Sequence, residues 1–307
     1  MGKGMWAWGA GDGRAPCPHP FTLARLRARI HLMMLSCRFA LSQKACEHNR
    51  RGSQTKFIKD HTKKIMKNYQ AALFDMDGVV ADTNQSVRDF WYMLARREKI
   101  TLSEEDFKHH IYGCPSEYTL TRLFPHMSAE TRLAIHEDIM VYERNMYYQA
   151  MPGVVDLLRD FKRQGILTAL VTSGRRWRVN LAFQHIGISE LFNAIVTVED
   201  ITRGKPDPEC YLLGARLLGK AAEDCLVFED AVSGIRAGYV AGATCVGIQE
   251  DAERAQALRD AGAALVVPDF RSMHLAPSSV SDFSTLVVQA DGTKYARFTL
   301  KADHVRR

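Results

Sequence analysis

The chain has 307 residues, of which 46% are hydrophobic and 25% are charged. These proportions are ordinary for a folded protein, and the length allows two domains. No apolar run approaches the roughly 20 residues that a membrane-spanning helix needs, which argues against a membrane protein. Residues 1–68 hold 14 of the 41 Lys and Arg residues and 3 of the 35 Asp and Glu residues, so they carry +11 and the remainder −5. A mildly acidic main body argues against nucleic-acid binding.

Residues 1–68 are rich in arginine, nearly free of acidic residues and irregular, so we predict a disordered N-terminal extension. In one interpretation, residues 23–30 form the basic amphipathic helix of an organelle-targeting presequence. In the other, which we favour, translation starts at Met66, only nine positions before Asp75, and the protein is cytoplasmic. Seven cysteines without paired metal-binding spacing also favour a reducing compartment.

Residues 71–83, Ala-Ala-Leu-Phe-Asp-Met-Asp-Gly-Val-Val-Ala-Asp-Thr, place two carboxylates just after an apolar run. Alternate side chains of a strand point the same way, so Asp75 and Asp77 can meet one substrate, and Gly78 lets the chain turn away. One carboxylate can attack phosphorus to form an aspartyl phosphate, while the other protonates the leaving oxygen. Because clustered carboxylates repel each other, a divalent cation is expected between them.

Residues 84–150 show apolar residues at helical spacing and no strand pattern, which predicts a separate helical unit. Such stripes form the core of a helical bundle more often than a cofactor site. Short linkers near residues 82–85 and 149–153 are the expected hinges. The residues that define the spacing are Phe90, Trp91, Leu94, Leu133, Ile135, Ile139 and Tyr142.

The rest of the chain alternates apolar, strand-like runs with amphipathic helical stretches such as residues 154–164 and 211–218. This alternation predicts an α/β fold, a doubly wound parallel sheet with helices on both faces, whose ligands bind beyond the carboxyl ends of the strands. The expected strands are residues 71–74, 166–171, 194–198, 225–228 and 244–248.

Further polar motifs follow these strands in order. Val171-Thr172-Ser173-Gly174 and Val227-Phe228-Glu229-Asp230 each end an apolar run, and Arg203-Gly204-Lys205-Pro206 lies between them. Together with the Asp75 motif, they resemble the haloacid dehalogenase superfamily from about Tyr69 to about Phe270. The resemblance implies a catalytic core at residues 69–83 and 151–272 and an inserted helical cap at 84–150, which closes over the phosphate site.

The resemblance also implies roles for individual residues. Asp75 is the expected nucleophile and Asp77 the general acid and base, while Lys205 neutralises charge on the phosphoryl group and restrains Asp75. Phosphate oxygens are expected on Thr172, Ser173 and Gly174. The implied cofactor is Mg²⁺, with ligands from Asp75, the Asp77 carbonyl and Asp230, and from Glu229 directly or through water.

The chemistry within the superfamily depends on the residue two positions after the nucleophile. An acid such as Asp77 suits phosphoryl transfer and argues against carbon–halogen cleavage. The expected activity is hydrolysis of a small phosphorylated metabolite, such as a sugar phosphate or phosphoglycolate. The alternatives are a β-phosphoglucomutase-type mutase and an inactive scaffold. Mutases of that type have a His and an Arg where this chain has Val87 and about Ser116, which favours the hydrolase.

Substrate contacts are less sharply marked in the sequence. Arg175, one of three arginines after the second motif, and Gly113, in the first cap loop, are candidates. The sequence does not fix an oligomeric state. Residues 273–307 follow the family match as a C-terminal extension, where the runs 285–289 and 294–300 flank a Gly-containing turn and predict a β-hairpin.

Overall fold

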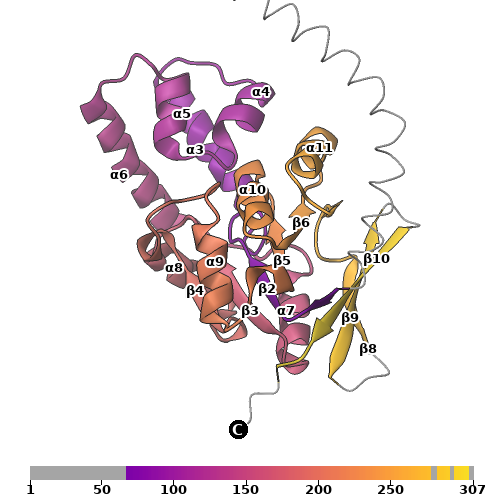
Figure 1. Ribbon diagram of the computed structural model, residues 1–307. Coiled ribbons are helices and arrows are strands. Elements are labelled where there is room, and N and C mark those ends of the chain that lie inside the picture. Colours follow the sequence, from indigo (N-terminus) through magenta and orange to yellow (C-terminus); the bar gives the residue numbers. More distant parts are fainter. Residues whose placement is uncertain (1–66, 278–281, 291–293, 304–307) are drawn as a thin grey trace, which may run out of the picture. The chain divides into compact units, whose positions relative to one another are not determined.

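The apolar runs form a six-stranded parallel sheet in the computed structural model, which describes residues 67–277, 282–290 and 294–303 (Figure 1). The extension expected at residues 1–68 therefore lies outside the described residues, except for its last two. The strand order is β4-β3-β2-β5-β6-β7, so the doubly wound α/β fold is confirmed. The strands are β2 (Ala71–Phe74), β3 (Leu167–Val171), β4 (Ala194–Val196), β5 (Cys225–Glu229), β6 (Thr244–Ile248) and β7 (Leu265–Val267).

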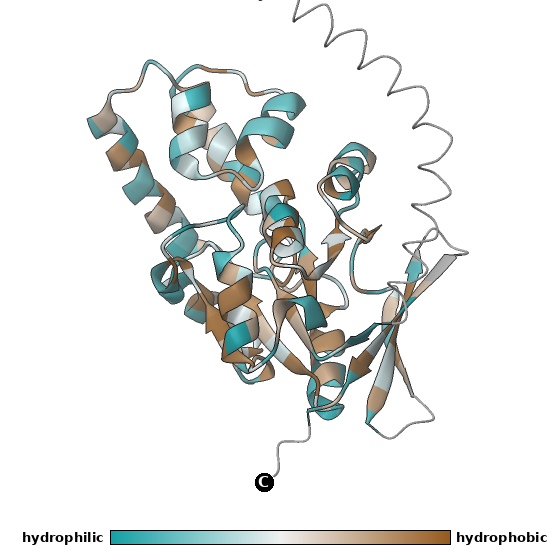
Figure 2. Cartoon of the chain, viewed as in Figure 1, coloured by the Kyte–Doolittle hydropathy of each residue, from teal (hydrophilic) through white to brown (hydrophobic). Residues whose placement is uncertain are grey.

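Helices cover both faces of this sheet because its side chains alternate between two apolar layers. In β2, Ala72 and Phe74 join the layer under α7 (Val154–Arg163) and α8 (Arg176–Ile186). Ala71 and Leu73 join the opposite layer, under α9 (Glu209–Leu217), α10 (Val232–Val240) and α11 (Ala252–Asp260). Figure 2 shows mainly hydrophobic strands in the sheet and both hydrophobic and hydrophilic residues along the helices. Short 3-10 turns occur at η2 (Ser189–Leu191), η3 (Val198–Asp200) and η4 (Ala222–Asp224).

The segment between β2 and α7 is helical and has its own apolar core. It consists of α3 (Asn84–Arg97), α4 (Glu104–Asp106) continuing into the π-helical turn η1 (Phe107–Ile111), α5 (Ser116–Leu123) and α6 (Ala129–Asn145). Phe90, Trp91, Leu94 and Ile135 are buried as expected, but Leu133 is 66% exposed. Placing Leu133 in the core was wrong, because residues two apart on a helix lie on nearly opposite sides and Ile135 faces inward.

A second sheet, ordered β1-β10-β9-β8, contains β1 (Asn68–Tyr69), β8 (Met273–Pro277), β9 (Phe283–Ala290) and β10 (Lys294–Lys301). Strands β9 and β10 pair antiparallel, while β1 lies parallel to β10. The rings of Tyr69 and Phe298 meet edge to face at 5.8 Å, and Tyr69 donates a hydrogen bond to Thr244 of β6. Leu286 and Phe298 belong to the same buried cluster as Phe161 of α7, so this second sheet shares a core with the six-stranded sheet.

None of the helices in the described part of the chain combines the length and apolarity that crossing a membrane requires.

Candidate active site

The polar motifs meet at the carboxyl edge of the central sheet, beneath the helical segment 84–150 (Figure 1). Asp75 follows β2 and Thr172 follows β3, while Glu229 is the last residue of β5 and Asp230 comes directly after it. Parallel strands bring these chain-distant residues together because their carboxyl ends share one edge. A cavity of about 540 Å³ lies over them and is lined from above by residues such as Val87 and Tyr142.

Lys205 is the cation at the centre of this edge. Its Nζ lies 2.5 Å from Asp75 Oδ1, 2.6 Å from Glu229 Oε1 and 3.2 Å from the Val171 carbonyl oxygen, so all three N–H groups have acceptors. Burial lowers the pKa of Lys205, but the Asp75 and Glu229 carboxylates outweigh it and hold the pKa above its usual value. Lys205 is therefore a fixed ammonium ion beside Asp75.

Glu229 is buried, and both oxygens of its carboxylate accept hydrogen bonds. Oε1 accepts hydrogen bonds from Lys205 and from the Tyr211 hydroxyl at 2.8 Å, and Oε2 accepts one from the Ala231 amide at 3.1 Å. A Cβ on Gly234 would come within 1.7 Å of this carboxylate, so a glycine there lets α10 begin against it. This arrangement positions Lys205, and the metal contact expected of Glu229 stays a prediction.

The carboxylates at this edge outnumber the cations that face them. Oxygens of Asp75, Glu229 and Asp230 lie within 4.8 Å of one another. Two cations face these three carboxylates: Lys205, and Arg254, whose Nη2 is 3.6 Å from Asp230. Burial, opposed by Lys205 and reinforced by Glu229 and Asp77, raises the pKa of Asp75 to about 7. Burial and the neighbouring Glu229 and Asp75 charges raise the pKa of Asp230 well above its usual value. An all-oxygen cluster with excess negative charge fits a hard divalent cation such as Mg²⁺.

Asp77 turns toward partners other than this cluster. Its Oδ1 accepts hydrogen bonds from Thr83 at 2.7 Å and from Arg178 at 2.6 Å, and its Oδ2 accepts a second bond from Arg178 at 2.6 Å. Burial raises the pKa of Asp77, but the Arg178 guanidinium and the hydrogen bonds from Arg178 and Thr83 outweigh it, so the pKa lies below its usual value.

The expected phosphate-binding residues line the cavity beside Asp75. Thr172 is buried, and its Oγ1 accepts a hydrogen bond from the Gly174 amide at 2.9 Å. The hydroxyl proton of Thr172 is thus available to an acceptor in the cavity. Ser173 is exposed between Thr172 and Gly174, and a Cβ on Gly174 would lie 3.2 Å from both Thr172 Oγ1 and Arg178 Nη1.

The two residues expected to contact the substrate, Gly113 and Arg175, line two different hollows. Gly113 lines the cavity, and its carbonyl accepts a hydrogen bond from Ser233 at 3.3 Å. A Cβ there would come within 2.6 Å of the Ala231 Cβ, and its φ is +67°, so glycine is required where the loop meets the core. Arg175 instead lines a neighbouring hollow of about 510 Å³, which shares Ser173 and Gly174 with the cavity.

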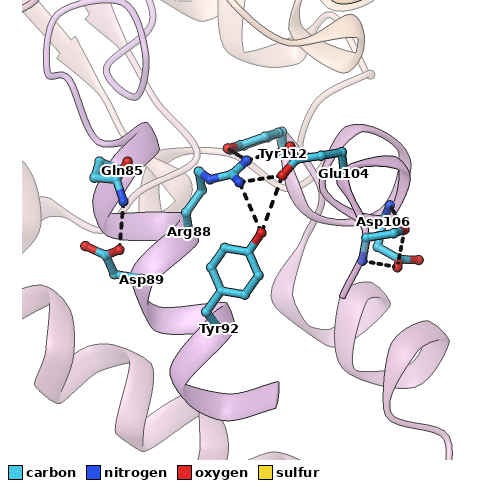
Figure 3. A network of polar contacts seen from close by, with 8 residues as sticks. Gln85, Arg88, Asp89, Tyr92, Glu104, Asp106 and Tyr112 are labelled. Atoms are coloured by element: carbon cyan, nitrogen blue, oxygen red, sulfur yellow. Dashed lines mark hydrogen bonds and ion pairs between the residues drawn. The ribbon is translucent and has the colours of Figure 1, made fainter. Parts of the chain in front are cut away.

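A polar network holds the loop that carries Gly113 (Figure 3). Arg88 of α3 makes a two-point ion pair with Glu104, at 2.6 and 2.9 Å, and also donates to the hydroxyls of Tyr92 and Tyr112. Its guanidinium stacks over the Phe107 ring at 4.6 Å. Because Tyr112 directly precedes Gly113, this network fixes the loop at the mouth of the cavity.

Comparison with known proteins gives the family. Residues 69–242 match the family model described as haloacid dehalogenase-like hydrolase, which is more than half of the chain. The chain belongs to the haloacid dehalogenase-like hydrolases. Hexitol phosphatase A of Escherichia coli (strain K12) is 33% identical over 59% of this chain and 83% of that protein. β-Phosphoglucomutase of Bacillus subtilis (strain 168) is 30% identical over 58% of this chain and 83% of that protein.

A solved structure agrees with this assignment. The HAD hydrolase of family IA, variant 3, from Entamoeba histolytica HM-1:IMSS superposes with a TM-score of 0.58 at 26% identity, covering 67% of this chain and 95% of that one. The resemblance inferred from the motifs is thereby confirmed, and the protein is an enzyme of this hydrolase family.

Three contacts of this haloacid dehalogenase-like hydrolase were not expected from its sequence. Tyr211 holds Glu229, while Thr83 and Arg178 hold Asp77. Helical periodicity contains a signal for Arg178, because it lies beside Val179 and four residues before Ala182 on the buried face of α8. Arg176 pairs with Asp200 at 2.6 Å, away from the cavity.

Proposed function

We propose that this protein is a magnesium-dependent phosphatase that hydrolyses small phosphate monoesters through an aspartyl phosphate. The observation that carries the proposal is the buried Lys205, which bridges Asp75 and Glu229 beside Asp230 at the floor of the cavity. A carboxylate restrained by an ammonium ion is an oriented nucleophile, and the same ammonium ion can stabilise charge that develops on a phosphoryl oxygen.

In the proposed mechanism, the phosphate rests against the Thr172 hydroxyl and the Ser173 amide, in the loop where the Gly174 amide holds Thr172. Asp77 takes up a proton as the substrate binds. An oxygen of Asp75 then attacks phosphorus while Asp77 gives that proton to the leaving oxygen. Asp77 then takes a proton from the water that attacks the aspartyl phosphate, which restores Asp75 and releases phosphate. Asp75, Asp230 and the Asp77 carbonyl would hold Mg²⁺, which supplies charge neutralisation at the phosphoryl oxygens. Glu229 supports Lys205.

The cavity favours water over a sugar hydroxyl as the acceptor. Val87 and Ser116 line it, where mutases of the β-phosphoglucomutase type have a His and an Arg. Neither residue supplies a cation for a second phosphate. A volume of about 540 Å³ suits a small metabolite such as a sugar phosphate or phosphoglycolate. We further propose that Gly113 contacts the leaving group, and that Arg175 meets only leaving groups long enough to enter the neighbouring hollow.

The proposed function predicts that the protein turns over phosphate monoesters and that turnover depends on Mg²⁺. With p-nitrophenyl phosphate and Mg²⁺, the protein should release inorganic phosphate, and EDTA should abolish the release because the buried carboxylates then lack their cation. In oxygen-18 water, labelled phosphate should be the main product from any accepted hexose phosphate. Faster formation of an isomeric hexose phosphate would establish the mutase instead, and absence of any turnover would leave a binding or scaffold protein.

The affinity for Mg²⁺ should decrease as the pH falls. The pKa of Asp75 is raised to about 7, so protons compete with the cation below that pH. Mg²⁺ measured calorimetrically should bind about tenfold more weakly at pH 6 than at pH 8. The Asp75→Asn variant should bind Mg²⁺ with less dependence on pH, and the dependence that remains should come from Asp230, whose pKa is also raised. Equal affinity of the native protein at both pH values would contradict a carboxylate of raised pKa among the ligands.

A further inference from the structure

Arg178 is a buried cation whose partners come from two parts of the chain. Only 8% of its side chain is exposed. Two of its nitrogens bind Asp77 at 2.6 Å, and its Nε lies 3.1 Å from Oε1 of Glu143 in α6. The guanidinium also lies over the Tyr148 ring, 5.6 Å from its centre. Arg178 is therefore held on several sides. Holding it there costs conformational entropy of the side chain and free energy of desolvation, neither of which a solvated arginine loses.

The hydrogen bonds to Asp77 leave its carboxylate few open positions. An ionised carboxylate has about four acceptor positions, two on each oxygen. Oδ1 uses both of its positions, on Thr83 and Arg178, and Oδ2 uses one on Arg178. One position on Oδ2 remains for a further donor. The paired bonds also fix the plane of the carboxylate, because a guanidinium and a carboxylate bound at two points are coplanar.

Glu143 holds the opposite edge of the guanidinium. It lies near the end of α6, three residues before the segment that returns to α7, and its neighbour Arg144 stacks over Trp177 of α8 at 5.1 Å. The contact between Glu143 and Arg178 is an ion pair without an aligned hydrogen bond. Glu143 thus helps to hold Asp77 in place through Arg178.

Building on the phosphatase function proposed above, we infer that Arg178 is a positioning residue for Asp77 in the second half of the reaction. It holds the carboxylate so that the open position on Oδ2 takes the proton of the attacking water. As that proton moves to Asp77, the water oxygen bonds to phosphorus, and the bond between phosphorus and the Asp75 oxygen breaks. Asp75 returns as a carboxylate and phosphate leaves.

The test compares the two half-reactions in the Arg178→Met variant. p-Nitrophenolate leaves without needing a proton, so phosphorylation of Asp75 should proceed almost normally, whereas hydrolysis of the aspartyl phosphate should be slowed about a hundredfold by a misplaced base. We expect kcat and KM to fall together, by up to that factor, and kcat/KM to change little. Rapid mixing should show a burst of one p-nitrophenolate per active site before the slow steady state.

Three further variants sharpen the test. Arg178→Lys keeps the charge but not the two-point bond, so it should show the same burst with a smaller loss of kcat. Glu143→Gln should have a weaker effect of the same kind and add little to Arg178→Met. Arg176→Met removes a neighbouring arginine of the same helix that does not touch Asp77, and its kinetics should match those of the native enzyme.

The results separate this inference from the function on which it rests. If the native protein releases no phosphate, the phosphatase function itself fails. If the native protein is active but Arg178→Met and Arg178→Lys keep normal kcat, or lose kcat and kcat/KM equally without a burst, the positioning role is wrong. Thermal unfolding identifies a variant that has lost its fold, and in that case Arg178→Lys decides.

Discussion

Replacing Asp75 by Asn should reduce steady-state hydrolysis at least about a thousandfold, because the amide cannot form the aspartyl phosphate. The side chains have nearly the same shape, and Lys205 keeps Glu229 as its partner. The substitution also removes a buried carboxylate whose pKa is raised to about 7, so it relieves repulsion with Glu229. The folded state should therefore survive.

The measurement is phosphate release together with thermal unfolding of both proteins. Asp82→Asn is a matched control, because Asp82 is exposed after the same strand and lines no part of the cavity. Its turnover should equal that of the native protein. Residual activity of Asp75→Asn above about a thousandth of the native rate would exclude Asp75 as the nucleophile.

Replacing Lys205 by Met should reduce both activity and stability. Met fills a similar volume but leaves Asp75 and Glu229 as buried carboxylates without their shared cation. Removing one partner of a buried ion pair typically costs about 3–5 kcal/mol of folding free energy. Loss of a cation that faces the phosphoryl group should lower kcat about a hundredfold or more.

Urea unfolding and phosphate release measure the two effects separately. Lys220→Met is the control, since Lys220 also forms an ion pair, with Asp303 at 3.0 Å, but lies outside the cavity. That variant should stay within about 1 kcal/mol of the native stability and keep full activity. A Lys205→Met protein with native kcat would mean that the ammonium ion has no part in the reaction.

The sequence was sufficient to predict five of the six strands of the parallel sheet and the clustering at its edge, because both follow from local patterns. The apolar runs that precede Asp75, Thr172 and Asp230 form parallel strands. The residues that follow parallel strands lie at one edge of the sheet. Strands β1, β7 and β8 were not predicted: β1 has two residues and β7 three, and β8 contains a proline, which is unfavourable within a strand. The pairing between β1 and β10 joins residues more than 200 positions apart. No local pattern encodes such a contact.

The environment of Asp77 could not be predicted for a related reason. Helical periodicity places Arg178 on the buried face of α8, but it does not show which carboxylate Arg178 meets there. Glu143 reaches Arg178 from a different helix, so their pairing depends on how α6 returns to the core. Local sequence gives the identity of these charges, whereas tertiary packing gives their partners.

The pairing of β1 with β10 bears on how the protein is made. Strand β1 leads through one residue into β2, the central strand that carries Asp75, yet its partner β10 lies after every catalytic motif. On the ribosome, all the residues of the active site emerge while this partner is still missing. Tyr69 of β1 can bond Thr244 of β6 before that point, but β1 gains its neighbouring strand only once β10 has been synthesised.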